Sequence, residues 1–162
     1  ADEDLLMAIA ATVEEYLRVK GVEYDLVTHP HTHASWETAH SARVRGNFLA
    51  KAVVLADEQG YLMAVVPATH HTQLAWVDEI LGRHLGLVTE EDLSSLFPDC
   101  EVGAVPPFGP AYGVRTVVDE ALFELPELFL EAGDHQSLVQ MSGRQFRALM
   151  YGHKVPRFSV HL

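Results

Sequence analysis

The hydrophobic positions of the chain follow a helical period in several segments. Apolar residues recur every three or four positions over residues 3 to 20, and Gly21 follows as a stop signal. Four further helices are predicted, over residues 36–44, 72–83, 90–97 and 143–150. Ser35, Thr89 and Ser142 are the expected N-caps, because each precedes a helical pattern and has a side-chain oxygen that can accept a backbone N–H.

Other apolar segments have the composition of strands. Residues 51–56 and 61–67 are joined by the turn signal Asp57-Glu58-Gln59-Gly60, which predicts a β-hairpin with both strands buried. Four shorter strands are predicted, over residues 22–27, 114–118, 128–131 and 137–141. Strands and helices follow in mixed order rather than in regular alternation. This order predicts an α+β (mixed α/β) domain with a mixed sheet and argues against a doubly wound nucleotide fold.

The length and composition fit one globular domain. With 162 residues, of which 48% are hydrophobic, the chain can enclose a continuous core, and we expect a single domain over residues 1–162. No apolar run approaches the roughly 20 residues of a membrane span, and the acidic first residues are unlike a targeting segment. A cytoplasmic protein is therefore expected, and the single cysteine, Cys100, suits a reducing compartment.

The charge balance limits the kinds of ligand that the surface can attract. The formal net charge is −12, from 11 Lys and Arg against 23 Asp and Glu, so the field of the whole molecule repels polyanions. Contacts of Lys and Arg with phosphates supply most of the affinity of ordinary nucleic-acid binders. Broad nucleic-acid binding is therefore not expected, and any contact with RNA must be local.

The segment Gly103-Ala104-Val105-Pro106-Pro107-Phe108-Gly109-Pro110 is a candidate binding loop. Proline fixes φ and removes its own N–H, whereas glycine lets the main chain approach another group closely. A stiff loop of this composition presents its remaining backbone groups to a ligand without a screen of side chains. The alternative is a structural connection between two elements, and the loop alone does not decide between them.

Two side chains outside this loop are further candidates. Lys51 opens an apolar strand, where its amine can hold a phosphate or carboxylate as a point charge. Lysine also blunts strand ends, which is the alternative for this residue. His135 follows a turn glycine, Gly133, just before a predicted strand, so its imidazole can lie at the mouth of a cleft. A plain surface turn is the alternative there.

Metal and nucleophile chemistry fit the sequence less well. The chain has 10 histidines, several of them in the segment 29–40, but they lack the paired Cys or the helical His spacing of zinc sites. We therefore expect neither a metal nor another cofactor. Cys100 lies between Asp99 and Glu101, whose charges oppose thiolate formation. No serine elbow, phosphate loop or dinucleotide fingerprint is present.

Taken in order, several segments resemble the YbaK/prolyl-tRNA synthetase-associated domain family, which comprises editing domains and free-standing deacylases of mischarged aminoacyl-tRNA. The resemblance covers about residues 20 to 150 and rests on the order and spacing of the motifs together. These motifs are Val27-Thr28-His29-Pro30, Lys51-Ala52-Val53-Val54-Leu55, Ala64-Val65-Val66-Pro67-Ala68, Gly103-Ala104-Val105-Pro106-Pro107-Phe108-Gly109, Val118-Asp119-Glu120-Ala121-Leu122 and Ala132-Gly133.

The resemblance implies a strongly curved mixed sheet with a pocket between the lysine strand and the loop. By position, Lys51 matches the family lysine that holds the phosphate of the terminal nucleotide, and Gly103 with Pro107 match the loop whose backbone receives the aminoacyl group. The other expected substrate contacts are Ala104, Val105, Pro106, Phe108, Gly109 and, near a pocket position that limits side-chain size in some members, His135. The implied reaction is ester hydrolysis by water, helped by the ribose hydroxyl of the substrate, without a metal or a protein nucleophile.

Three classes of function stay open at this point, of which a histidine-based metal protein is the least favoured. The resemblance implies an aminoacyl-tRNA acceptor end as substrate, such as that of Ala- or Cys-tRNA(Pro), and allows an aminoacyl-tRNA synthetase as a partner. The acidity and the histidine-rich segment 29–40 depart from what an RNA-binding protein needs. A non-catalytic module that binds a small molecule or a partner protein on the same fold is therefore the alternative. The sequence indicates neither the amino acid and tRNA nor the oligomeric state.

Overall fold

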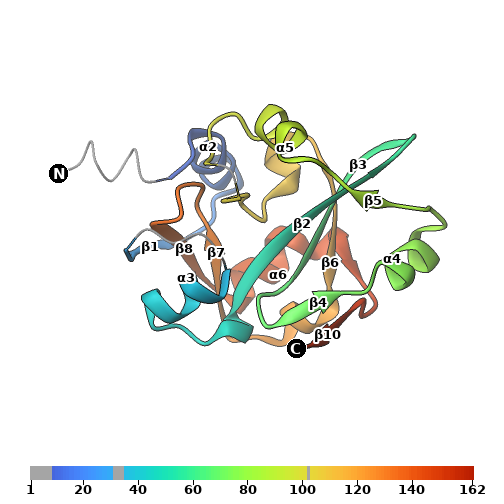
Figure 1. Cartoon of the computed structure of the whole chain (residues 1–162). Helices are drawn as coiled ribbons and strands as arrows, with labels where there is room; N and C mark the ends of the chain where they lie inside the picture. Colours follow the sequence, from blue (N-terminus) through green and yellow to red (C-terminus); the bar gives the residue numbers. More distant parts are fainter. Residues whose placement is uncertain (1–8, 31–34, 102) are drawn as a thin grey trace.

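A curved mixed sheet forms the centre of the molecule in the computed structural model, which describes residues 9–30, 35–101 and 103–162 (Figure 1). The strand order is β1-β8-β7-β2-β3-β6-β9, with β5 paired to β2, while β4 and β10 form a separate two-stranded sheet. The strands are β1 (Asp25–Thr28), β2 (Leu49–Asp57), β3 (Gly60–Pro67), β4 (His70–Thr72), β5 (Gly86–Leu87), β6 (Arg115–Asp119), β7 (Glu127–Glu131), β8 (Ser137–Ser142), β9 (Lys154–Val155) and β10 (Ser159–His161). The β2–β7, β3–β6 and β6–β9 pairs are parallel and the others antiparallel, which confirms the mixed sheet.

Five α-helices accompany the sheet in the described part of the chain. They are α2 (Ala11–Lys20), α3 (Ser35–Ala42), α4 (Leu74–Leu81), α5 (Glu90–Leu96) and α6 (Gly143–Met150). The short 3-10 helices are η1 (Gly46–Phe48), η2 (Gly109–Tyr112), η3 (Glu120–Glu124) and η4 (Tyr151–His153). Two predicted N-caps are confirmed, because Thr89 accepts the Asp92 N–H and Ser142 accepts the Gln145 N–H. Among the helices described, none combines the length and the apolar character of a membrane span.

The predicted element ends differ from the structure where tertiary contacts compete with the local pattern. The first helix begins at Ala11, because the N–H of Ala10 donates to the carbonyl of Ala132 at 2.8 Å instead of continuing a helix. Residues 3–8 of the predicted helix lie outside the described residues. Ser35 is the first residue of α3 rather than its cap. Helix α4 is shorter than the predicted helix over residues 72–83. Thr72, the first residue of that prediction, belongs to β4, and Gly82, with φ of 64°, ends the helix.

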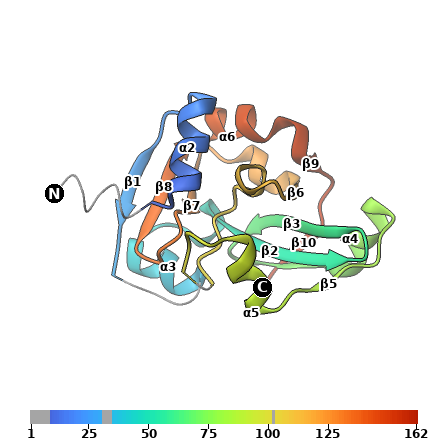
Figure 2. The ribbon, with the colours of Figure 1, turned by 90° about the horizontal axis from the view of Figure 1, so that it is seen from above.

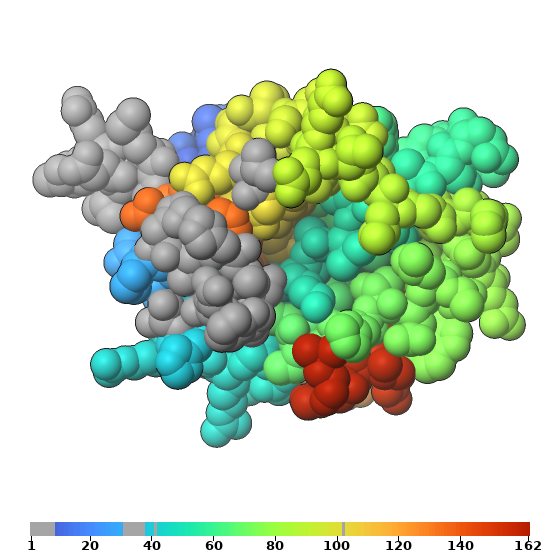
Figure 3. Space-filling view, viewed as in Figure 1, coloured from blue at the N-terminus to red at the C-terminus, as the bar shows by residue number. Residues whose placement is uncertain are grey.

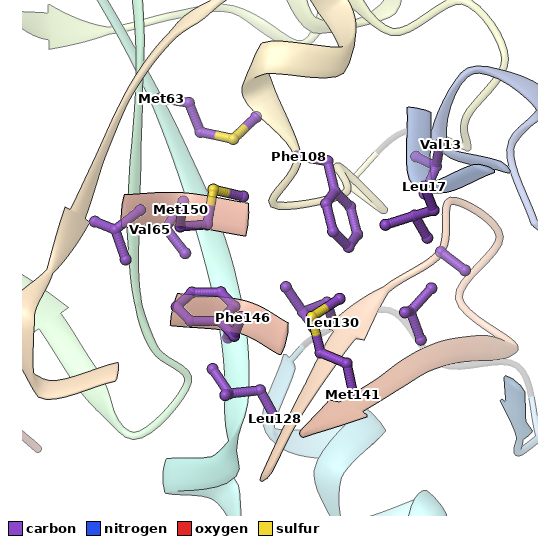
Figure 4. Close-up of a cluster of buried hydrophobic side chains, with 14 of the residues drawn as sticks. Val13, Leu17, Met63, Val65, Phe108, Leu128, Leu130, Met141, Phe146 and Met150 are labelled. Atoms are coloured by element: carbon purple, nitrogen blue, oxygen red, sulfur yellow. The ribbon is translucent and has the colours of Figure 1, made fainter. Parts of the chain in front are cut away.

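Both faces of the sheet are covered, which explains the nearly continuous apolar sequence of β3. Met63 and Val65 face a core that also contains side chains from α2, α6, β7, β8 and the loop residue Phe108 (Figure 4). Leu62, Ala64 and Val66, which alternate with them, pack with residues of α4 and the segment before β10. In Figure 2, α2 and α6 lie on one side of β7 and β8 and α3 lies on the other. A strand buried on both faces carries few polar positions.

Asp119 fixes the C-terminal segment to the end of β6. The side chain is fully buried, and its Oδ2 accepts the Phe158 N–H at 3.0 Å and the Ser159 hydroxyl at 2.7 Å. Its Oδ1 accepts the Ala121 N–H at 2.9 Å, which caps η3. This carboxylate therefore ties the start of β10, which pairs with β4, to the end of β6.

Replacing Asp119 with alanine should lower the free energy of unfolding by about 3 kcal/mol, because it leaves buried donors without an acceptor. Urea denaturation of the wild type and the variant measures this change. Asp25→Ala, at an exposed position on β1, is the matched control and should change stability little. A loss for Asp119→Ala no larger than that of the control would show that the other contacts of β10, among them its pairing with β4, hold it without this carboxylate.

Candidate active site between strands β2 and β7

The candidate site lies where two parallel strands separate. Strands β2 and β7 pair only at Leu49 with Phe129 and at Ala50 with Leu130. On the same edge of β2, the next pairing is that of β5, at Leu55 and Ala56. Residues 51–54 therefore have no strand partner on this edge among the described residues, although β3 pairs along the whole opposite edge. The gap between the strands opens the sheet to a ligand.

A small cavity of about 70 Å³ occupies this opening. It is lined by Thr38 of α3, by Leu49, Ala50, Lys51 and Ala52 of β2, by Gly103 and Val105 of the loop, and by Glu131 and His135. Lys51 follows Ala50, and Glu131 follows Leu130, and the pair of Ala50 with Leu130 is the last between β2 and β7. Both Lys51 and Glu131 therefore lie next to the point where the two strands separate. Figure 3 shows a depression near the middle of this face, between the yellow segment around residue 100 and the surface of β2.

Lys51 is a half-buried cation at this cavity. Burial lowers the pKa of its amine, because the charged form loses hydration. Lys51 has neither a hydrogen bond nor a salt bridge to any of the residues that the structure describes. An unneutralised cation at a small opening favours an anionic group as ligand.

Glu131 brings a carboxylate to the same cavity and was not a candidate from the sequence. Its Oε1 accepts the backbone N–H groups of Ala132 at 3.1 Å, Gly133 at 3.2 Å and His135 at 3.2 Å. Burial raises the pKa of Glu131 to about 7, the charge of Asp134 acts in the same direction, and the three backbone donors oppose both. The only sequence signal was a carboxylate directly after the apolar residues of a strand and directly before Ala132-Gly133.

The loop and the turn after β7 meet at this cavity. Gly103 has φ of 82°, and a Cβ added there would lie 3.5 Å from His135 Nε2. His135 is buried and itself has a positive φ of 60°, an uncommon conformation for a residue with a side chain. The candidates Lys51, Gly103, Val105 and His135 are thus brought together, as lining of one cavity.

The remaining loop candidates lie behind the lining. Ala104, Pro106, Pro107, Phe108 and Gly109 are buried and do not line the cavity. Phe108 is fully buried in the main core, and a Cβ at Gly109 would lie 2.0 Å from Thr116 Oγ1. These five residues therefore hold the loop against the core, while Gly103 and Val105 face the opening.

Hydrogen bonds attach the start of the loop to its surroundings. The N–H of Glu101 donates to Gly133 at 2.8 Å, which joins the loop to the turn after β7. Asp99 accepts the Thr12 N–H of α2 and the Tyr112 hydroxyl, both at 2.9 Å. The loop is therefore tied to two elements before it reaches Gly103.

Cys100 is held within this anchor, where its surroundings disfavour the thiolate. Its Sγ lies 3.2 Å from the Tyr112 hydroxyl oxygen. Burial raises the pKa of the thiol to about 12, and the charge of Asp99 adds to this effect. The thiolate, which is the reactive form, is therefore not populated at neutral pH.

No group of three or more His, Cys, Asp or Glu side chains is arranged to hold a metal ion within residues 9–30, 35–101 and 103–162. His31 and His33, which belong to the histidine-rich segment, lie outside the described residues. The described residues thus supply a cation, a carboxylate, an imidazole and a glycine-containing backbone loop at one small opening.

A family model described as an aminoacyl-tRNA editing domain matches residues 29–149, which is most of the chain. The chain belongs to this YbaK-like aminoacyl-tRNA editing domain family. The matched segment includes Lys51, the loop from Gly103, and Glu131 with His135. A search of curated proteins gave no match.

Solved structures show the same fold at low identity. The hypothetical protein APE2540 superposes with a TM-score of 0.80 at 23% identity, covering 92% of this chain and 99% of that one. A protein described as a candidate trans-editing enzyme for prolyl tRNA synthetase gives 0.78 at 23% identity, covering 91% and 94%. A candidate signal transduction protein from Marinobacter aquaeolei VT8 gives 0.74 at 21% identity, and the match covers 92% of this editing-domain chain but only 30% of that protein.

The raised pKa of Glu131 should make the free energy of unfolding depend on pH. The carboxyl prefers its protonated form in the folded state, so its stabilising effect is complete below the unfolded pKa of about 4.5 and is lost as the pH rises through about 7. Glu131→Gln resembles the protonated form at every pH. It should match the wild type near pH 4 and be more stable by up to about 3 kcal/mol at pH 8.

Thermal and urea unfolding at several pH values measure this difference. Glu124→Gln, at an exposed position in η3, should show no such pH-dependent gain. A constant difference between Glu131→Gln and the wild type from pH 4 to pH 8 would contradict a raised pKa at Glu131.

Proposed function

We propose that this editing-domain chain, as one domain over residues 1–162, is a deacylase that hydrolyses the ester of mischarged aminoacyl-tRNA in trans. The observation that carries the proposal is that Lys51 and the loop residues Gly103 and Val105 line one cavity. The family match and the likeness to a structure described as a candidate trans-editing enzyme support it.

The proposed reaction depends on positioning rather than on a reactive side chain. The Lys51 amine holds the phosphate of the terminal nucleotide, and the backbone around Gly103 holds the aminoacyl group, with Pro107 behind it keeping the loop in place. A water molecule attacks the ester carbonyl, helped by the free hydroxyl of the terminal ribose. Fixed donors close to the developing oxyanion and a fixed reacting geometry supply the rate enhancement.

The size of the cavity favours a small aminoacyl group. The cavity is small, with a volume of about 70 Å³. His135 fills one side of the cavity, and it is the residue that would limit the side chain admitted. Alanyl and cysteinyl esters are therefore the first substrates to examine.

A local patch that contains Arg157 and Lys51 offers RNA an approach despite the net charge of −12. Burial lowers the pKa of His70, and the charge of Asp119 opposes this effect. The charges of His161, Arg157 and Lys51 lower this pKa further, so these side chains are close enough to interact with His70. His70 and His161 face each other across the β4–β10 pair, with ring centroids 5.6 Å apart. The proposed contact with the acceptor end is therefore confined to this patch and to Lys51, with any synthetase partner supplying further RNA contacts.

Lys51→Ala should lower deacylation by at least about tenfold, which corresponds to about 1.4 kcal/mol of transition-state stabilisation. The measurement is release of labelled amino acid from a panel of mischarged tRNAs, led by alanyl- and cysteinyl-tRNA carrying the proline anticodon. Lys20→Ala removes an exposed lysine on α2 and is the matched control, expected to retain full activity.

The panel separates the proposal from its alternative. Unchanged activity of Lys51→Ala would remove the role given to the lysine. If the wild type releases nothing from any member of the panel, while amino acids or nucleotides raise its melting temperature, the chain is a binding module instead.

Gly103→Ala should reduce deacylation by about tenfold, because a side chain strains the backbone at φ of 82° and the added methyl group would contact His135 at the cavity. The positive φ of 82° also makes the substitution cost about 1 kcal/mol of stability. Gly82→Ala is the control: its φ is 64°, no atom lies near the added Cβ, and it should lose similar stability without losing activity. Equal activity of the two variants would exclude a role for the loop backbone at Gly103.

A further inference from the structure

We propose that Glu131 forms an ammonium subsite, in which its free carboxylate oxygen binds the α-ammonium group of the aminoacyl ester. The inference rests on the proposed function and deepens it, because it specifies which esters the site accepts. A substrate must then carry an unblocked primary amine. N-acylated esters, including those of peptidyl-tRNA, are refused.

The two carboxylate oxygens of Glu131 differ in their hydrogen bonds. All three backbone N–H contacts, from Ala132, Gly133 and His135, go to Oε1. No described residue donates a hydrogen bond to Oε2, and the side chain lines the cavity. Oε1 therefore fixes the carboxylate in place, and Oε2 is the oxygen with capacity for a ligand.

The carboxylate also lacks a cationic partner. Glu131 forms no salt bridge with any of the described residues, Lys51 included, although both line the cavity. A carboxylate that is largely removed from water and unpaired is unfavourable. This cost agrees with the raised pKa of Glu131, and a cation that enters with the substrate would remove it.

The two charges of the site match the two charges of the proposed substrate. The acceptor end of aminoacyl-tRNA carries a phosphate on the terminal nucleotide and an ammonium group on the amino acid. Lys51 is the cation and Glu131 the carboxylate at the same cavity, and they enter it from adjacent strands. With the phosphate at Lys51, the ammonium group at Glu131 would hold the ester between them, next to the loop backbone at Gly103.

A role of Glu131 as general base for the attacking water is the rival assignment, and it makes a different prediction. A base acts on the water whatever the state of the amine, so its loss slows free and N-acylated substrates alike. An ammonium subsite acts only on substrates that carry the charged amine. Comparing the two kinds of substrate therefore separates the two roles.

The test uses non-hydrolysable analogues, 3′-(alanylamino)-3′-deoxyadenosine 5′-phosphate and its N-acetyl derivative, with the full chain and titration calorimetry. The wild type should bind the free-amine analogue at least about tenfold more tightly than the N-acetyl analogue. Glu131→Gln, which keeps an oxygen for the three N–H donors, should lose this preference by weakening only the free-amine analogue. Glu124→Gln, at its exposed position in η3, should keep the wild-type preference.

Each outcome has a defined meaning. Equal binding of both analogues by the wild type overturns the subsite without the need for any variant, even if the mischarged-tRNA panel shows hydrolysis. A preference that survives in correctly folded Glu131→Gln also overturns it, as does an equal slowing by that variant of alanyl- and N-acetylalanyl-tRNA hydrolysis. Failure to bind either analogue together with an inactive panel removes the proposed function and this subsite with it.

Discussion

The separation of β2 from β7 after only two paired positions is the constraint on which the site depends. Beyond Ala50 and Leu130 each strand continues without the other, and the backbone edge of β2 stays open until β5 joins at Leu55. An unpaired edge inside a sheet needs something to cover it. Here the loop from Gly103 and the turn after Glu131 come to this edge, and the small cavity is what remains between them.

The same constraint explains why charged groups occur beside a buried sheet. Lys51 and Glu131 stand where their strands leave the pairing, so their ends reach the opening while their backbones stay within the sheet. Burial acts on both, lowering the pKa of the amine and raising that of the carboxyl. Neither charge is neutralised by the other or by a described neighbour, which reduces stability in the free protein. Such uncompensated polar groups are typical of sites whose partner is a ligand.

Elements that depend on residues close in sequence could be predicted, whereas elements that form only by pairing with a distant strand could not. The β2–β3 hairpin and the caps at Thr89 and Ser142 depend on residues close in sequence, and the structure confirms them. Strand β4 was missed because His70 and His71 lack a strand pattern and extend only by pairing with β10, nearly 90 residues later. Lys51 and Gly103 could be selected because a strand-end amine can hold an anion, because glycine exposes loop backbone to a ligand, and because both match positions of the resembled family. Glu131 could not, since a carboxylate at a strand end usually faces water and only the fold turns it toward Lys51's cavity.

The way the loop is anchored bears directly on the chemistry proposed for it. Phe108 is fixed in the main core with side chains from α2 and α6, and Asp99 binds α2 at the other end, so the loop is attached on both sides of Gly103. Hydrolysis that relies on position needs such rigidity, because the donors must already point at the place where charge develops. Cys100, which lies within the anchor, does not supply a nucleophile, because burial favours its protonated thiol. The firm attachment of the loop thus suits the proposed reaction, in which the core would set the geometry of the loop and the substrate would supply the reactive hydroxyl.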